Sequence, residues 1–349
     1  MKFSYVMLPN YPLSQSLESI KLADELGFYA VYAADETWWK DLWLLFAAAA
    51  SSTTRVRFGP SVSAVTLREP TLIAQSVATL DELTNGRAEA VLGSGNFGLL
   101  AQYKTDWKTT KPLSRVKEGL QVMRTFLDDG AITFDGEFFQ YGGLFTFARP
   151  VQDHLPLKMG AMRGPKSFEV AAEFSDGCHH ALSYNREAYE YMIEHCTIGA
   201  ERAGKDVQSL DLGAWVVFSV GEDSAAAKDA ARSMVGLYAS SMPEEQLIRN
   251  GVTPEDVAPI IEAIGAGDMA RGIELTSPEL AEKLSIAGTP EECVDKIKTE
   301  IQSAGVNHMI CAITDAALVK SLMGREVEGA ADVDTQLRMI ADKVMPAFA

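Results

Sequence analysis

Residues 56–93, VRFGPSVSAVTLREPTLIAQSVATLDELTNGRAEAVLG, contain one complete repeat of the predicted fold. Two short apolar runs, residues 56–62 and 87–93, favour β-strands. Between them, Pro70 opens a segment with apolar residues at helical spacing, and Asn85-Gly86 ends it. A strand, a helix and a second strand in this order predict a parallel βαβ unit.

The same alternation continues on both sides of this unit. Further strand-like runs are found at residues 2–8, 28–33, 157–161, 177–182, 210–220 and 307–313. Helical patterns follow most of these runs, and several strands are apolar on both faces, as parallel strands covered by helices are. We therefore expect an α/β protein with a single (β/α)8 TIM barrel, and a doubly wound open sheet is the alternative.

Two segments interrupt the alternation and are predicted as insertions. Residues 131–147 are rich in turn residues and aromatics, which favours a small hairpin-like excursion. Residues 222–288 carry an excess of helical and loop sequence, and we expect a helical insertion before the last βα unit. The sequence Thr289-Pro290-Glu291-Glu292 then predicts a helix start with a capping box. The whole chain, residues 1–349, is expected to form one barrel domain.

The composition disfavours several classes of protein. The 349 residues include 31 Lys and Arg against 48 Asp and Glu, a net charge of −17, which disfavours binding to nucleic acids and anionic membranes. The longest apolar run, residues 42–50, is shorter than the ~20 residues that span a bilayer. The four cysteines are widely spaced without a CxxC motif, and no targeting signal is recognised, so we expect a reduced, cytoplasmic protein.

Unusual residues follow the second and third predicted strands, where a barrel would place its active site. The run Ala34-Asp35-Glu36-Thr37-Trp38-Trp39 is either a helix cap with aromatics packed under a loop, or a polar anchor and a wall for a flat aromatic ligand. Gly59-Pro60 indicates a bulge or close backbone approach, or simply the end of the strand.

Glycine-rich runs follow the fourth and fifth predicted strands. The run Gly93-Ser94-Gly95-Asn96-Phe97-Gly98 matches GxGxxG, but no acidic residue ends a strand about 20 residues later, which disfavours a dinucleotide site. Its glycines would still let a ligand lie over the strand end. In residues 160–167, Arg163 and Lys166 near a helix start predict a phosphate site, with a plain surface turn as the alternative.

Metal and nucleophilic chemistry find little support. His179 and His180 are adjacent in a predicted strand, so their side chains point to opposite faces and only one can enter the barrel. The sequence has no HExxH and no GxSxG motif. We therefore predict no metal site.

Taken together, several segments resemble the bacterial-luciferase-like superfamily. They are most similar to the branch that uses the deazaflavin coenzyme F420, especially methylenetetrahydromethanopterin reductases. The segments that carry this resemblance are MKFSYVMLPN (1–10), Ala34-Asp35, GPSVSAVTLREP (59–70), ATLDELTNGRAEAVLGSGN (78–96), PLKMGAMRGP (156–165) and IAGTPEECVDKI (286–297).

The resemblance implies a (β/α)8 barrel that forms a homodimer, with the flat cofactor ring at the carboxyl ends of the strands. It implies that Asp35 contacts the ring and that Trp38 or Trp39 walls the substrate side. A non-prolyl cis peptide between Ser61 and Val62 would form a bulge behind the ring. The other implied cofactor contacts, along the ring or near its phosphate, are Gly93, Ser94, Gly95, Asn96, Gly160, Ala161, Arg163, Gly164 and Gly177.

Two positions depart from the family pattern. Glu36 stands where many F420 enzymes of this fold have histidine, and Asn96 stands where they often carry an acid. Our hypothesis is that Asp35, Glu36 and Asn96 form the catalytic set, and that Glu36 handles the proton with its pKa raised by Trp38 and Trp39. We predict a substrate pocket formed by Trp38, Trp39, Phe97 and His180.

The leading functional hypothesis is an oxidoreductase that transfers hydride between C5 of F420 and a small organic substrate, tetrahydromethanopterin-like or other. One alternative is an FMN-dependent monooxygenase that uses a separate flavin reductase. A second alternative is a barrel that binds a flavin or deazaflavin without catalysis.

Overall fold

The computed structural model describes residues 1–8 and 11–349, without the side chains of Phe97 and Lys108. Within these residues, eight parallel strands close into a ring, because β9 pairs with β8 on one side and with β11 on the other. The barrel strands are β1 (Lys2–Met7), β2 (Ala30–Asp35), β3 (Arg57–Ala64), β4 (Ala90–Gly93), β7 (Leu157–Ala161), β8 (Gly177–Ala181), β9 (Asp211–Val220) and β11 (His308–Ile313). The predicted (β/α)8 barrel is confirmed, and the open-sheet alternative is wrong.

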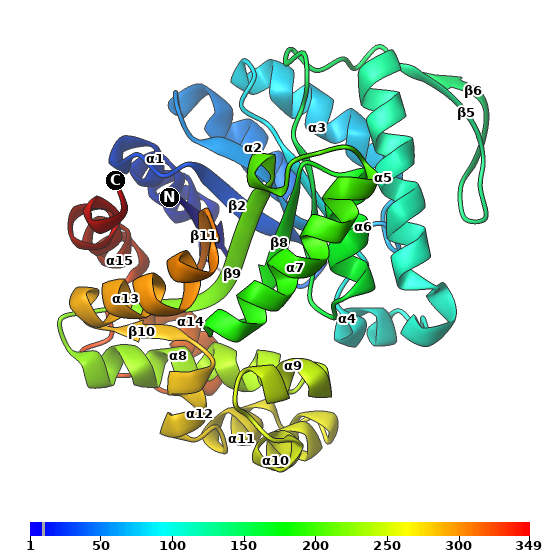
Figure 1. The fold of residues 1–349 in the computed structure, drawn as a ribbon. Helices are drawn as coiled ribbons and strands as arrows, with labels where there is room; N and C mark the ends of the chain where they lie inside the picture. Colours follow the sequence, from blue (N-terminus) through cyan, green and yellow to red (C-terminus); the bar gives the residue numbers. More distant parts are fainter. Residues whose placement is uncertain (9–10) are drawn as a thin grey trace.

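Helices surround this barrel (Figure 1). The first group is α1 (Leu13–Leu26), α2 (Leu42–Ala49), α3 (Pro70–Thr84), α4 (Phe97–Gln102), α5 (Pro112–Asp129), α6 (Lys166–Phe174) and α7 (Arg186–Arg202). The second group is α8 (Ser224–Ala239), α9 (Glu244–Arg249), α10 (Pro254–Gly265), α11 (Met269–Glu274), α12 (Pro278–Lys283), α13 (Pro290–Lys296), α14 (Ala316–Met323) and α15 (Val333–Met339). Short 3-10 and π segments are η1 (Ala50–Ser52), η2 (Trp107–Thr110), η3 (Val207–Ser209), η4 (Ile297–Ile301), η5 (Gln302–Ala304), η6 (Ile340–Val344) and η7 (Met345–Phe348).

The helix ends follow the local sequence signals. Pro70 is the first residue of α3, the Glu69 side chain accepts from the backbone N–H of Thr71 and Leu72, and Asn85 ends the helix in the left-handed conformation at φ 53°. At the start of α13, the capping box between Thr289 and Glu292 is present as predicted.

Two parts of the chain lie outside the regular barrel pattern. The strands β5 (Ala131–Asp135) and β6 (Gln140–Phe145) pair as an antiparallel hairpin that projects from the body beside α5 (Figure 1). Between α8 and β11, the helices α9 to α12 gather on one side, and a short strand, β10 (Ile286–Gly288), pairs with the end of β9. Because α8 packs against β9, it is the barrel helix of that strand, and the additional helices begin after it.

The third strand does not end at Gly59-Pro60. It continues to Ala64, and its pairing with β4 shifts register between Ser61 and Ser63. Gly59 is required by a close backbone approach, because an added Cβ would lie 2.3 Å from the carbonyl oxygen of Glu89. The bulge alternative for this segment is therefore the one that the structure adopts.

Candidate active site

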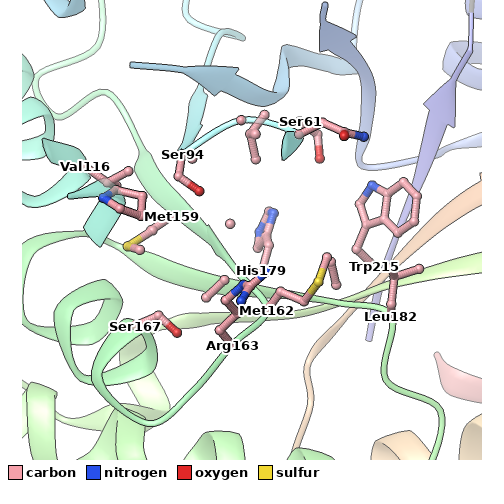
Figure 2. Close-up of a pocket in the computed structure, with 18 of the residues that line it drawn as sticks. Ser61, Ser94, Val116, Met159, Met162, Arg163, Ser167, His179, Leu182 and Trp215 are labelled. Atoms are coloured by element: carbon pink, nitrogen blue, oxygen red, sulfur yellow. The ribbon is translucent and has the colours of Figure 1, made fainter. Parts of the chain in front are cut away.

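A cavity of about 400 Å³ opens at the carboxyl ends of the barrel strands. Its wall is mostly apolar, with a few polar groups, as is usual for a site that holds a small organic ligand. The predicted residues that line it are Glu36, Ser61, Val62, Gly93, Ser94, Gly95, Asn96, Gly160, Ala161, Arg163 and Gly164. The structure therefore brings together, around one cavity, residues from four different strand ends (Figure 2).

A backbone bulge shapes one side of the cavity. The peptide bond between Ser61 and Val62 is cis, which confirms the expectation for this position. The Val62 side chain occupies the space above two glycines: an added Cβ would lie 2.6 Å from Val62 Cγ2 at Gly93 and 2.5 Å from Val62 Cγ1 at Gly160. The glycines on β4 and β7 thus leave room for a valine that faces the cavity.

Asp35 lies behind this surface rather than on it. Its carboxylate accepts hydrogen bonds from Ser63 Oγ (2.5 Å) and from the Trp43 indole (3.3 Å), and it lies 3.8 Å from the Arg68 guanidinium. Asp35 is absent from the residues that line the cavity. In this structure it ties the end of β2 to β3 and α2, and its direct contact with the cofactor ring stays a prediction.

Glu36 is the acidic residue that reaches the cavity. Burial raises the pKa of its carboxyl to about 7, and the negative charge of Asp35 adds to this rise. A side-chain hydrogen bond with Trp39 acts in the opposite direction. The predicted rise of the Glu36 pKa is therefore present, but its cause is burial in the barrel mouth, and Trp39 reduces it.

The aromatic wall comes from other residues than predicted. Trp38 is 43% exposed and its indole donates to Gln102 Oε1 (3.0 Å); neither Trp38 nor Trp39 lines the cavity. The aromatic residues that do line it are Trp107, Trp215 and Tyr238, from η2, β9 and α8. Trp215 and Tyr238 meet edge to face at 5.2 Å. The predicted pocket residue Phe97 has a side chain that lies outside the described part of the structure.

Asn96 joins the cavity wall to a helix. Its side chain accepts from the backbone N–H of Gly98 (2.8 Å) as the N-cap of α4. Gly95 has a φ of +88°, which a residue with a side chain rarely adopts. The Asn96 amide is therefore held in place by the helix that follows it.

The loop between β7 and α6 forms the far wall. Arg163 lies over the Trp107 ring at 4.4 Å, and Ser167, in the first turn of α6, also lines the cavity. Ser167 Oγ is buried and has no hydrogen-bond partner among the described residues. Lys166, in contrast, is 69% exposed and pairs with Glu169 at 3.0 Å, so the two predicted cations do not act as a pair.

Two predicted positions lie away from the cavity. Gly177 begins β8 at the opposite end of the barrel, where an added Cβ would lie 2.5 Å from the carbonyl oxygen of Asp211. Its small size serves strand packing, so its predicted role beside the phosphate is wrong. His180 faces outward and is paired with the carbonyl of Ala161 (3.1 Å) and with Ser183 Oγ (2.7 Å). The histidine that enters the cavity is its neighbour His179.

Beneath the cavity, the barrel interior holds a network of charged residues that the sequence analysis missed. Lys158 Nζ lies 2.7 Å from Glu89 Oε1 and 3.0 Å from Asp211 Oδ2, and all three side chains are buried. Arg57 also pairs with Glu89 at 3.0 Å. The signal was present in the sequence, because Glu89 and Lys158 are charges inside strands that are otherwise apolar.

Asp211 of this network and two histidines beside it, His179 and His308, form a cluster of side chains of the kinds that bind metals. His179, Asp211 and His308 offer ligand atoms within 4.8 Å of one another. Asp211 Oδ1, however, bonds both imidazoles, at 3.1 Å and 2.8 Å, and Asp211 Oδ2 is taken by the Lys158 ammonium. The group is therefore held together as an ion-pair and hydrogen-bond network.

The fold and the cavity define a (β/α)8 barrel with a mostly apolar cavity at the carboxyl ends of its strands. Residues 1–308 match the family model described as luciferase-like monooxygenase, and the chain belongs to this family.

Several relatives are similar over almost the whole chain. The 5,10-methylenetetrahydromethanopterin reductase of Methanolobus tindarius is 29% identical over 333 residues, which cover 94% of this chain and 100% of that protein. The structure of the coenzyme F420-dependent tetrahydromethanopterin reductase from Methanopyrus kandleri superposes with a TM-score of 0.88 at 25% identity, covering 100% of this chain and 99% of that one. An F420-dependent secondary alcohol dehydrogenase, solved with an F420-acetone adduct, shares the fold with a TM-score of 0.80 at 21% identity and covers 100% of this chain and 99% of its own.

Within the described residues, none of the helices combines the length and the apolar composition needed to cross a bilayer.

Proposed function

We propose that this chain transfers hydride between coenzyme F420 and a small organic substrate, with a tetrahydromethanopterin derivative as the first candidate. The chain is an oxidoreductase of the luciferase-like family. Relatives named as methylenetetrahydromethanopterin reductases and a putative F420-dependent oxidoreductase of Mycobacterium tuberculosis, 27% identical over 338 residues, support the choice of cofactor and reaction.

The observation that carries the proposal is the surface made by Val62, Gly93 and Gly160. Val62 faces the cavity from the bulge, and the two glycines beside it add no side chains. Such a surface suits one face of a flat ring system, which can pack on the valine without meeting Cβ atoms.

The far wall suits the phosphate of such a cofactor. The buried Ser167 Oγ lacks a partner within the described residues, and it sits in the first turn of α6, where backbone N–H groups favour an anion. Arg163, exposed above the Trp107 ring, adds a positive charge at the same edge. These residues would hold the phosphate, while Ser94 and Asn96 border the ring.

When bound, the deazaflavin supplies the hydride at its C5 carbon. The apolar wall with Trp215 and Tyr238 excludes water and orients the substrate. Glu36, whose pKa lies near 7, can hold or release a proton at its carboxyl oxygen at neutral pH.

The test is a titration of the purified protein with F420 and, separately, with FMN, followed by fluorescence quenching. Micromolar or tighter binding of F420 with weak FMN binding supports the proposal. The opposite preference would support the FMN-dependent monooxygenase, and oxygen consumption with a separate flavin reductase would then be measured. Tight binding without turnover on any acceptor would support the hypothesis of a barrel that binds the cofactor without catalysis.

We also propose that the chain forms a homodimer through α2 and α3. These helices pack against each other and expose Leu44 (74%), Leu72 (53%) and Leu83 (55%). Exposed leucines on neighbouring helices favour burial against a second copy.

A further inference from the structure

His179 is a buried residue whose ring lines the cavity, and one of its nitrogens has no hydrogen-bond partner in the part of the chain that the structure describes. The side chain is only 2% exposed and lines the cavity, where Figure 2 shows it among the lining side chains. Its Nε2 lies 3.1 Å from Asp211 Oδ1, whereas its Nδ1 has no hydrogen-bond partner among the described residues. A buried polar atom without a partner is costly, which points to a partner that arrives with the ligand.

The network beneath the cavity determines which nitrogen carries the proton. Burial alone would raise the pKa of Asp211, but His308, the Lys158 ammonium and the hydrogen bond from His179 hold it well below its usual range, so Asp211 is an ionised carboxylate that only accepts. His179 Nε2 and His308 Nδ1 must therefore both donate to Asp211 Oδ1. His308 Nε2 in turn accepts from Ser4 Oγ (2.6 Å), as a neutral imidazole should.

The same network leaves His179 Nδ1 as a bare acceptor. Burial lowers the pKa of His179 to about 4, so the ring is neutral at physiological pH and has one proton, on Nε2. A neutral nitrogen with a free lone pair attracts an N–H or O–H group and repels a carbonyl oxygen. It therefore discriminates between the polar edges of a ligand.

The position of His179 links it to the cofactor surface. Its Cα pairs in register with that of Gly160 on the neighbouring strand β7, and parallel partners direct their side chains to the same face. Above Gly160 lies the Val62 side chain. The imidazole is therefore next to the surface on which, under the proposed function, the ring of the cofactor rests.

We propose that His179 Nδ1 accepts a hydrogen bond from a ring N–H of the bound deazaflavin, and so fixes how the ring is oriented on the Val62 surface. This inference rests on the proposed function. The imide N–H between the two carbonyl groups of the pyrimidine edge is a donor of the required kind. Asp211 and Lys158 act through His179, since they hold the tautomer and the ring angle.

Two substitutions test the roles of the two ring nitrogens of His179 separately. His179→Gln keeps an amide donor near the Nε2 position for Asp211 and removes the acceptor at Nδ1. His179→Asn places an amide oxygen near the Nδ1 position and removes the contact with Asp211. We expect His179→Gln to weaken F420 binding about tenfold and His179→Asn to weaken it less, in fluorescence titrations without substrate.

His180→Gln is the matched control, because His180 is equally buried at the next position but faces away from the cavity. It should bind F420 as the wild type does. Equal F420 affinity of the wild type and His179→Gln would overturn the inference, and so would a loss confined to His179→Asn.

A second measurement uses the wild-type protein, so it tests the inference even if a His179 variant does not fold. In wild-type protein with nitrogen-15-labelled histidine, the Nδ1 resonance of His179 should move on saturation with F420, and an unchanged resonance would contradict the inference. If the wild type does not bind F420, the proposed cofactor is wrong. The same comparison is then made with FMN, which carries the same imide N–H, and equal affinities would again overturn the role of His179.

Discussion

Val62 and Gly160 are complementary in shape, because a Cβ added at position 160 would lie only 2.5 Å from Val62 Cγ1. The two residues lie on β3 and β7, which are separated by β4 in the sheet. The contact spans β4 because Gly93 on that strand also lacks a side chain and leaves room for Val62. The shape of this side of the cavity thus depends on the Val62 side chain and on the lack of side chains at Gly93 and Gly160.

Gly160→Ala tests this relationship. Because Val62 is β-branched and its other methyl group already fills the space at Gly93, it has little room to move. We expect a loss of about 1–3 kcal/mol in the free energy of unfolding, measured in urea, and weaker F420 binding. Gly142→Ala is the control, since an added Cβ there meets nothing within 4 Å. Equal stability of the two variants would show that the bulge is more adaptable than its geometry indicates.

Ser167→Ala tests the phosphate end of the site. If the buried hydroxyl bonds a charged phosphate, its removal should weaken F420 binding by about tenfold or somewhat more. Ser209→Ala, at an exposed hydroxyl that donates to the Asp206 carbonyl, should leave the affinity unchanged. Affinity that is unaffected by Ser167→Ala would place the phosphate elsewhere.

Glu36→Gln tests the proton donor. Because the pKa of Glu36 is raised to about 7, its carboxyl is protonated below neutral pH and ionised above it. A step that needs a proton from Glu36 should therefore slow as the pH rises through about 7, and this inflection should disappear in the variant. The measurement is the rate of oxidation of reduced F420 by methylenetetrahydromethanopterin across neutral pH. An inflection that persists in Glu36→Gln would assign it to another group.

Lys158→Met tests the buried network. Removal of the ammonium leaves Glu89 and Asp211 facing each other without the cation that lies between them, and we expect a loss of about 3–5 kcal/mol in the free energy of unfolding. Lys320→Met breaks a pair with Glu326 in which both side chains are more than half exposed, so it should change stability by less than about 1 kcal/mol. Similar losses in the two variants would contradict the special role of the buried lysine.

The buried network also predicts that the protein loses stability as the pH falls. The pKa of Glu89 is lowered to about 2, although burial alone would raise it, because Lys158 and Arg57 favour the carboxylate. The lowered pKa stabilises the fold at pH values above the ordinary pKa of 4.5, and this contribution is lost as the pH falls toward about 2. In urea unfolding, Glu89→Gln should flatten this acid-side loss of stability.

The proposed dimer predicts that Leu44→Glu and Leu72→Glu together yield a monomer in sedimentation experiments. Both side chains are exposed in the single chain, so the substitutions should leave its folding unaffected, as far-ultraviolet circular dichroism would show. Phe147→Glu, at a side chain that is 92% exposed near the hairpin, is the control and should leave the dimer intact. A wild type that sediments as a monomer would remove the proposal.

The local parts of this fold were accessible from the sequence because local energies determine them. Alternating apolar runs, Pro70 at a helix start and the capping box of Thr289 and Glu292 act over a few residues, and the structure keeps them. Parallel strands that are apolar on both faces are compatible with few architectures, so the barrel could be predicted from the sequence. Glu36, close to the end of a strand, was found for the same reason, whereas the site role of Ser61 came from the family resemblance.

Only the tertiary structure decided which side chains meet in the cavity. Trp215 and Tyr238 are far in sequence from Glu36, and the closure of the ring brings them to the wall in place of Trp38 and Trp39. His179 and His180 are equivalent in the strand pattern, and the barrel turns one toward Asp211 and the cavity and the other outward. Sequence determines the alternation of elements through local forces, whereas the identity of the cavity wall depends on contacts between strands distant along the chain, which exist only after the barrel has closed.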